Sequence, residues 1–365
     1  MKNGMKRTGE TPPNILPRTL DMATPASPLY CVQRYRPDRE ATSKEIQLLQ
    51  QHFRGQIHDL HLEGKLRFQV TPQLISYHFL YYPLGLPVLR LYARYKLIHL
   101  YTSLCDRPYL PFLNQKNMVI TSPNFVSAER IKSKIAYLQK VRQIIVQSEV
   151  EKKELLAAGL TKEKISIIYP PVDLEQFSYR EPPARFTILN ASCPGKARDL
   201  RKRGIYFLLG FDQDLDDEQV KFLWRGGEFS VFLKEIRKRP FRHMRIENQI
   251  HKDMNEQYAQ VHCTIIPYQQ FDEYLKLVPT SVIESLAAGK PVLVSSQTGV
   301  AEIIRKEACG VVFEPVQKSF LVALAELRKN YWRYQKNCRT TAEKYFSQEQ
   351  FLKKHEQVYT GLMAP

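Results

Sequence analysis

The sequence predicts an α/β protein with two doubly wound domains, and three observations support this prediction. Short apolar runs with strand character alternate with helical patterns, which is typical of parallel sheets covered by helices. The chain of 365 residues is long enough for two domains that each bury a core. Adjacent prolines near residues 170–184 forbid a helix and favour an extended connector between the domains.

Apolar runs mark the predicted buried strands, and helical patterns such as residues 150–158 and 281–288 lie between them. The predicted strands are residues 29–33, 97–101, 118–121, 143–147, 165–169, 186–190, 221–224, 261–267 and 291–295. Ligands of open α/β sheets bind at the carboxyl ends of strands, so the residues after each run are the first candidates for a site.

The composition is close to that of an average globular protein. Apolar residues make up 43% and charged residues 25% of the chain, so extensive disorder is not expected. The six cysteines are widely spaced and contain no C-x-x-C pair, so neither a zinc site nor a redox motif is predicted. Residues 1–28 are expected to form a flexible tail. This tail has no apolar core of a signal peptide, which favours a cytoplasmic protein.

Much of the formal net charge of +17 lies in one region, because residues 67–142 hold eleven Lys or Arg against only Asp106 and Glu129. Aromatic and leucine side chains between Tyr77 and Tyr95 are interleaved with basic residues, which favours a surface that lies against anionic lipid. The alternative is an amphipathic core helix with a solvated basic face. The region is too interrupted to span a membrane, and no nucleic-acid-binding module accompanies it, so no nucleic acid partner is expected.

The most informative stretch covers residues 279–295. Ser281 is a suitable N-cap and Glu284 lies three residues later, which predicts that a helix begins here. Gly289 would end this helix and Pro291 would open the next strand. The first amides of the helix would be unpaired donors at the positive end of its dipole, and they would form a natural phosphate site.

These residues resemble the signature of the retaining glycosyltransferases of family 4 (glycosyl transferases group 1). Their GT-B fold has two Rossmann-like domains whose parallel sheets face each other across a cleft. The signature is a glutamate, seven residues, a second glutamate, a small-residue helix and Gly-x-Pro-Val; Glu284 matches the second glutamate and residues 289–295 match the Gly-x-Pro-Val segment and its strand. Further segments at residues 146–177, 253–267 and 345–359 resemble the same family, so the resemblance spans most of the chain.

The resemblance implies a hexosyltransferase that moves a sugar from a UDP- or GDP-sugar to a glycan or lipid-linked acceptor, with retention of configuration. Residues 29–178 would form the acceptor-binding domain and residues 179–345 the domain that binds the nucleotide sugar. Residues 346–365 would form a helix that crosses back to the first domain. No cofactor is required besides the donor substrate. The acceptor is expected at the cytoplasmic face of a membrane, as in polysaccharide biosynthesis.

The resemblance also assigns the donor site. Glu284 would hold the ribose hydroxyls, while its alternative role is to close a capping box with Ser281. Thr280, Ser281 and Val282 would lie near the nucleotide because they start the same helix. The first glutamate of the signature is missing and Lys276 stands in its place. This lysine either meets the carboxylate of an acidic sugar or a phosphate, or is a solvated loop residue.

Lys202, Arg203 and Gly204 match the family's lysine before a glycine, with Arg203 at the matching position. Their charges would stabilise the departing diphosphate, and the alternative is a solvated basic loop. The family's arginine after the first strand of this domain is absent at residues 191–195.

Acceptor candidates lie just after predicted strands of the first domain. They are Arg34, Asp106, Arg107 and Asn124, with His99 as an outside candidate that is more often a core residue. The family's histidine after residues 118–121 is absent, and Asp212 and Asp214 are not expected to hold a metal. Lys276, Ser192 and the missing histidine motivate a rival hypothesis, a catalytically impaired GT-B relative that acts as a glycan-binding or interaction module.

Overall fold

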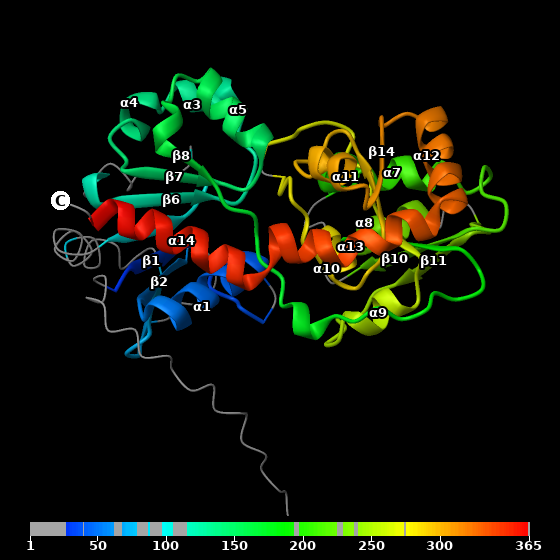
Figure 1. Cartoon of the computed structure of the whole chain (residues 1–365), viewed down its shortest axis with the longest axis horizontal. Coiled ribbons are helices and arrows are strands. Elements are labelled where there is room, and N and C mark those ends of the chain that lie inside the picture. Colours follow the sequence, from blue (N-terminus) through cyan, green and yellow to red (C-terminus); the bar gives the residue numbers. More distant parts are fainter. Residues whose placement is uncertain are drawn as a thin grey trace, which may run out of the picture.

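The computed structural model describes residues 27–38, 40–61, 68–78, 87, 97–104, 115–192, 197–224, 229–236, 240–273 and 275–363. Two lobes lie side by side along the long axis, each built on a largely parallel sheet with helices packed around it (Figure 1). The predicted fold class is confirmed. The strand-like runs identified in the sequence all become strands, with ends that differ from the predicted ones by at most two residues.

The first sheet has eight strands in the order β3-β4-β2-β1-β5-β6-β7-β8. Only β3 pairs antiparallel with its neighbour β4; the other pairs are parallel. The strands are β1 (Leu29–Val32), β2 (Gln56–His61), β3 (Phe68–Val70), β4 (Leu74–His78), β5 (Ile98–Tyr101), β6 (Met118–Ser122), β7 (Gln143–Val146) and β8 (Ile165–Ile167). The basic aromatic stretch begins at the end of β4, so its first two residues, Tyr77 and His78, lie in a strand rather than in the helix of the alternative hypothesis.

The helices of the first lobe include α1 (Ala41–Phe53), α3 (Ala128–Lys132), α4 (Ile135–Leu138) and α5 (Glu149–Ala157), with short 3-10 turns η3 (Gln115–Asn117) and η4 (Lys162–Lys164). Helix α5 begins with a capping box. The Ser148 hydroxyl accepts a hydrogen bond from the Glu151 amide and donates one to the Glu151 carboxylate, at 3.2 and 2.7 Å.

The second sheet has six parallel strands in the order β11-β10-β9-β12-β13-β14. They are β9 (Thr187–Ser192), β10 (Gln219–Trp224), β11 (Met244–Glu247), β12 (Cys263–Ile266), β13 (Val292–Ser295) and β14 (Gly310–Phe313). Turn η5 (Leu174–Gln176) precedes this sheet, and its helices are α6 (Ala197–Lys202), α7 (Ile205–Leu209), α8 (Phe229–Ile236), α9 (Asn255–Ala259), α10 (Thr280–Ala287), α11 (Ala301–Glu307), α12 (Gln317–Lys329) and α13 (Tyr331–Phe346).

Helix α14 (Gln348–Met363) leaves the second lobe and packs on the first, as the red helix of Figure 1 shows. Its Phe351 and Tyr359 are buried in one core cluster with Tyr30 and Ile46 of the first lobe. The chain thus crosses between the lobes twice. The two crossings touch, because the Val172 amide donates to the Phe346 carbonyl at 2.7 Å.

Within the described ranges, no helix combines the length and apolarity needed to cross a membrane. Most of the stretch predicted to face anionic lipid, residues 79–96, lies outside the described residues, with Pro87 as the exception.

Candidate active site between the two domains

A cavity of about 580 Å³ lies between the two domains. The loop after β1 lines it from the first domain, and the carboxyl ends of β9 and β12 with the start of α10 line it from the second. Its polar walls include Arg34, Arg36, Asp38, Glu40, Asn190, Ser192, Arg203, Lys276, Thr280 and Ser281. This is the place where open α/β sheets bind ligands.

A smaller cavity of about 340 Å³ lies between α1, the crossing at residues 170–177 and α10. Glu45 lines it from α1, and Glu284 lines it from α10. Lys276 and Thr280 line both cavities, so they mark the region where the two adjoin.

The larger cavity carries more positive than negative side chains. Arg34, Arg36, Arg203 and Lys276 stand against Asp38 and Glu40. Arg34 also forms an ion pair with Glu40, at 3.7 Å. A concave wall with this balance attracts anions such as phosphates.

Arg203 owes its place to the glycine after it. Gly204 has a φ of +69°, and a Cβ atom there would lie only 1.8 Å from the Pro267 carbonyl oxygen after β12. Only glycine lets this loop approach the strand end so closely. The Arg203 Nε atom is buried and has no hydrogen-bond partner within the described part of the chain. The residue itself lines the cavity.

Lys202, predicted to act with Arg203, points elsewhere. Its ammonium forms an ion pair with Asp272 and lines a separate hollow with Tyr206 and Gln270. The structure therefore separates the two residues, and only Arg203 reaches the cavity between the domains.

Helix α10 begins at Thr280, after an extended Pro279, and no side chain caps its first amides. The predicted N-cap at Ser281 is wrong, because Ser281 already lies inside the helix and Pro279, with φ −67° and ψ 137°, has the extended backbone of the N-cap residue. The capping-box role of Glu284 is excluded with it. The Glu284 carboxylate instead accepts a hydrogen bond from the Tyr258 hydroxyl at 2.9 Å.

The three helix-start candidates have different surroundings. Thr280 and Ser281 line the larger cavity. Val282 does not, because its side chain is fully buried in the core and its amide donates to the Pro279 carbonyl at 3.0 Å. The expectation that Val282 contacts the nucleotide is therefore corrected, since the helix turns this residue toward the sheet.

Lys276 is neither a solvated loop residue nor an unpaired cation. Its ammonium lies 3.0 Å from the carboxylate of Glu45, a residue of the other domain that is only 1% exposed. The second Glu45 oxygen accepts from the Gln147 side chain at 2.9 Å. Glu45 and Gln147 were not predicted from the sequence. Lys276 and Glu45 are 231 positions apart, and no local pattern links residues at such a separation.

The acceptor candidates are scattered. Arg34 lines the larger cavity, and Asn124 lies in the loop after β6, beside the contact in which the Phe125 amide donates to the Leu275 carbonyl at 2.8 Å. Asn124 is not among the residues that line the cavity. Asp106 and Arg107 lie outside the described residues.

His99 is a core residue, which corrects its candidacy for the acceptor site. Its ring is fully buried between the Tyr359 hydroxyl, at 2.6 Å, and the Thr121 hydroxyl, at 2.7 Å. Burial holds the pKa of His99 well below its usual value. A neutral ring that joins α14 to β5 and β6 has a structural role.

The sequence analysis also missed the side chains that hold the cleft together. The Ser127 amide and hydroxyl both donate to Glu273 Oε1, at 2.9 and 2.6 Å.

Two other buried carboxylates lie outside the predicted site. Burial raises the pKa of Glu151, the capping-box glutamate of α5, to about 7. Asp212 is buried, and its carboxylate accepts hydrogen bonds from the amides of Arg242 and His243. Among the described residues, no group of three or more His, Cys, Asp or Glu is placed to hold a metal.

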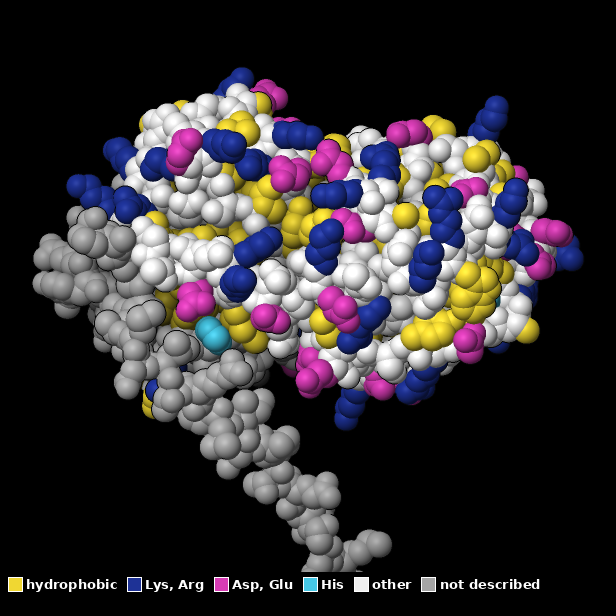
Figure 2. All heavy atoms as spheres, in the orientation of Figure 1, with side chains coloured by type: hydrophobic (Ala, Val, Ile, Leu, Met, Phe, Trp, Pro, Cys, Tyr) yellow, Lys and Arg dark blue, Asp and Glu magenta, His cyan; other side chains and the backbone are white. Residues whose placement is uncertain are grey.

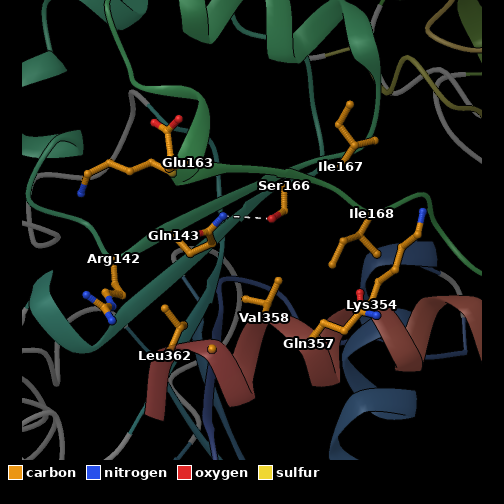
Figure 3. Close-up of a pocket in the computed structure, with 12 residues that line it drawn as sticks. Arg142, Gln143, Glu163, Ser166, Ile167, Ile168, Lys354, Gln357, Val358 and Leu362 are labelled. Carbon is orange, nitrogen blue, oxygen red and sulfur yellow. Dashed lines mark hydrogen bonds between the residues drawn. The ribbon is translucent and has the colours of Figure 1, made fainter. Parts of the chain in front are cut away.

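A third hollow, of about 640 Å³, lies away from this cleft, between the β7–β8 edge and α14 (Figure 3). Val358 and Leu362 of α14 point toward the strands, where Gln143 donates to Ser166 at 2.9 Å. Figure 2 shows hydrophobic side chains exposed beside α14, with Lys and Arg around them. None of the site residues predicted from the sequence lines this hollow.

The fold and the cleft define the class of this protein as GT-B, the two-domain fold of many glycosyltransferases. The family is indicated by the second domain, because residues 214–345 match the family model described as glycosyl transferases group 1. These findings confirm the predicted GT-B fold and the similarity of the second domain to glycosyl transferases group 1. A comparison with curated protein sequences gives no significant match.

Solved structures share the fold over nearly the whole chain. Sucrose-phosphate synthase from Thermosynechococcus elongatus has a TM-score of 0.71 at 13% identity, covering 92% of this chain and 99% of that one. A glycosyltransferase from Rickettsia africae has a TM-score of 0.70 at 14% identity, covering 93% and 99%. Anabaena HepE in complex with UDP and glucose has a TM-score of 0.69 at 13% identity, covering 92% and 100%.

Proposed function

We propose that the protein is a retaining glycosyltransferase that moves a hexose from a UDP- or GDP-sugar to a glycan or lipid-linked acceptor. The observation that carries the proposal is the cation-lined cavity between the domains, which Arg203 lines beside the start of α10. The structure of HepE with UDP and glucose supports it, because that protein shares the fold and its two ligands are the parts of a nucleotide sugar.

The main catalytic task is to stabilise the leaving group. Negative charge grows on the nucleotide diphosphate as the bond to the sugar breaks, and fixed cations next to it lower the barrier. Arg203 supplies a guanidinium at this place, and the start of α10 at Thr280 and Ser281 adds the positive end of a helix dipole. Closure of the cleft around the donor would exclude water, so that the sugar is transferred rather than hydrolysed.

Glu284 is proposed to hold the ribose hydroxyls. The residue is 9% exposed and lines the smaller cavity, and its carboxylate is oriented by the Tyr258 hydroxyl. A carboxylate held in this way accepts hydrogen bonds from a diol with good geometry. Retention of configuration is proposed from the resemblance to family 4.

The first domain, residues 29–178, is proposed to bind the acceptor, and the second, residues 179–345, the donor. Residues 346–365 would return to the first domain as the closing helix. Because the basic aromatic stretch falls in the first domain, the acceptor is proposed to be lipid-linked, at the cytoplasmic face of an anionic membrane, in the biosynthesis of a polysaccharide.

The proposal is tested by adding UDP and GDP separately and measuring the melting temperature, and then by assaying release of the nucleotide from its sugar conjugate. One nucleotide should raise the melting temperature, because a ligand that binds only the folded state stabilises it. The Arg203→Ala variant should show a smaller rise. The rival hypothesis, an impaired relative that only binds glycans, predicts that neither nucleotide changes the melting temperature or is released.

A further inference from the structure

An ion pair joins the two domains in the region where the two cavities adjoin. Lys276 lines both cavities, and Glu45, whose carboxylate lies 3.0 Å from the Lys276 ammonium, lines the smaller one. A ligand in the cleft can therefore reach an ammonium and a carboxylate that are already bound to each other.

Both charges of this pair are held in place. The Glu45 side chain is 2% exposed and the Lys276 side chain 19% exposed. Gln147 donates to the other oxygen of Glu45 at 2.9 Å. A charge so far from water needs a compensating partner, and removing one member leaves the other uncompensated. The charge of Lys276 is thus already neutralised before any ligand arrives.

The two cavities differ in charge. The larger one has four basic and two acidic side chains, whereas Glu45, Asp173 and Glu284 face Lys44 and Lys276 in the smaller one. A diphosphate fits the larger cavity, whereas the smaller cavity, in which acidic side chains outnumber basic ones, does not favour a second anion.

Resting on the proposed function, we infer that the Glu45–Lys276 pair selects donors with a neutral sugar over donors whose sugar bears a carboxylate. The ribose and the transferred sugar lie at opposite ends of the diphosphate. With the ribose at Glu284 in the smaller cavity and the diphosphate at Arg203 in the larger one, the sugar would remain in the larger cavity, which Lys276 also lines. Sugar hydroxyls can accept from the ammonium and donate to the carboxylate. A uronate would place its own carboxylate near buried Glu45, and like charges at such a site repel each other. This replaces the expectation that Lys276 meets an acidic sugar.

The test compares the affinities of UDP-glucose and UDP-glucuronate by calorimetry, with GDP-mannose and GDP-mannuronate if the protein binds GDP. The wild type should bind the neutral donor more tightly. Glu45→Gln leaves the ammonium uncompensated, and should shift the affinity ratio toward the uronate by about tenfold or more, the effect of one charged hydrogen bond. Lys276→Gln leaves the carboxylate alone and should shift the ratio the other way.

The opposite directions of the two shifts distinguish a role in specificity from a purely structural role. If the pair only held the domains together, its loss would weaken the binding of both donors by the same factor. Glu302→Gln is the matched control. It breaks the exposed interdomain pair of Lys153 and Glu302, at 3.1 Å, and should leave the ratio unchanged. Should Glu45→Gln fail to fold, the more exposed Lys276→Gln still measures the shift.

The inference would be overturned if the wild type bound the uronate donor more tightly, or if the two variants shifted the affinity ratio in the same direction or not at all. These outcomes would leave the proposed function standing. Absence of binding by UDP, GDP and every donor would overturn the proposed function, and the inference with it.

Discussion

The hydroxyl of Tyr258 lies 2.9 Å from a carboxylate oxygen of Glu284 and 3.2 Å from the carbonyl oxygen of Ser281, so its one proton is shared between these two acceptors. One tyrosine of α9 thus fixes both the first turn of α10 and the carboxylate one turn further along. Because Tyr258 is fully buried, this arrangement is rigid before a ligand binds.

Replacing Glu284 by Gln should lower kcat/KM for the nucleotide sugar, because a charged hydrogen bond to the ribose is lost. The loss should correspond to about 1.5–3 kcal/mol of transition-state stabilisation. The free energy of unfolding should change little, since an amide can still accept from Tyr258. Steady-state kinetics and urea unfolding of the same variant check the two parts. Unaltered kinetics would remove Glu284 from the donor site.

The structure separates Arg203 from Lys202, and their variants should behave differently. Arg203→Ala should lower kcat about 10²–10³-fold, which corresponds to an increase of about 2.7–4 kcal/mol in the activation free energy. This is the usual cost of losing one hydrogen-bond donor to the charge that develops in the transition state. Lys202→Ala removes only the ion pair with Asp272. It should change the activation free energy by no more than about 1 kcal/mol. A larger loss for Lys202 than for Arg203 would show that the loop is arranged differently in the working enzyme.

Gly204 should not tolerate a side chain. Gly204→Ala should lower the free energy of unfolding by about 2–4 kcal/mol, because the positive φ is strained and the methyl group meets the Pro267 carbonyl. Gly159→Ala is the control, since Gly159 also has a positive φ, of +100°, but nothing lies within 4 Å of its added Cβ. It should show only the conformational strain of a side chain at positive φ, a loss of about 1–2 kcal/mol in the free energy of unfolding. Equal losses at both glycines in urea unfolding would argue against the close approach at Gly204.

Acid should weaken the docking of α14 through His355. Burial lowers the pKa of His355 from 6.5 to about 4, so between these values the unfolded chain binds more protons than the folded one. The contribution of this residue is therefore present above pH 6.5 and is lost as the pH falls toward about 4, by up to roughly 3 kcal/mol. The His355→Phe variant has no titrating side chain at this position, so it lacks this pH-dependent contribution to the free energy of unfolding. The difference between the unfolding free energies of wild type and variant should shrink over that pH range, and a constant difference would contradict the assignment.

The lipid-facing prediction concerns Arg90, Arg94 and Lys96. Changing all three to Glu should abolish sedimentation with anionic liposomes, since each basic residue contributes about 1 kcal/mol at such a surface. Raised salt should weaken wild-type binding in the same assay. The control variant changes three exposed lysines of the second domain to Glu, namely Lys318, Lys329 and Lys336. A wild type that stays in the supernatant at low salt would refute the prediction.

The parallel strands were predictable where apolar residues run together, as in β5, β6 and β13. Strand β2 was missed because its sequence, Gln56–His61, carries four polar side chains among six residues. Its pairing with β1 and β4 comes from the sheet, and it overrides the local preference. Strand β14 was missed because its run is short and starts with glycine.

The candidate site was predictable only where it coincides with a local motif. The loop at Arg203 and the helix at residues 280–287 were found from spacing, although the cap lies two residues before the expected one. The partners of Lys276 and Glu284 could not be found in this way. Both arise from packing between segments distant in the sequence, and nothing in a single sequence pairs Lys276 with Glu45.

The docking of α14 on the first sheet also affects how the protein is made. Domains generally fold as they leave the ribosome, from the N-terminus onward. Here the face of the first domain that includes Tyr30 and Ile46 is closed by Phe351 and Tyr359. That face has no cover until the whole second domain and then α14 have been synthesised. A nascent chain therefore exposes apolar surface for most of its translation, and holding chaperones would have their longest opportunity to bind on the domain that is made first.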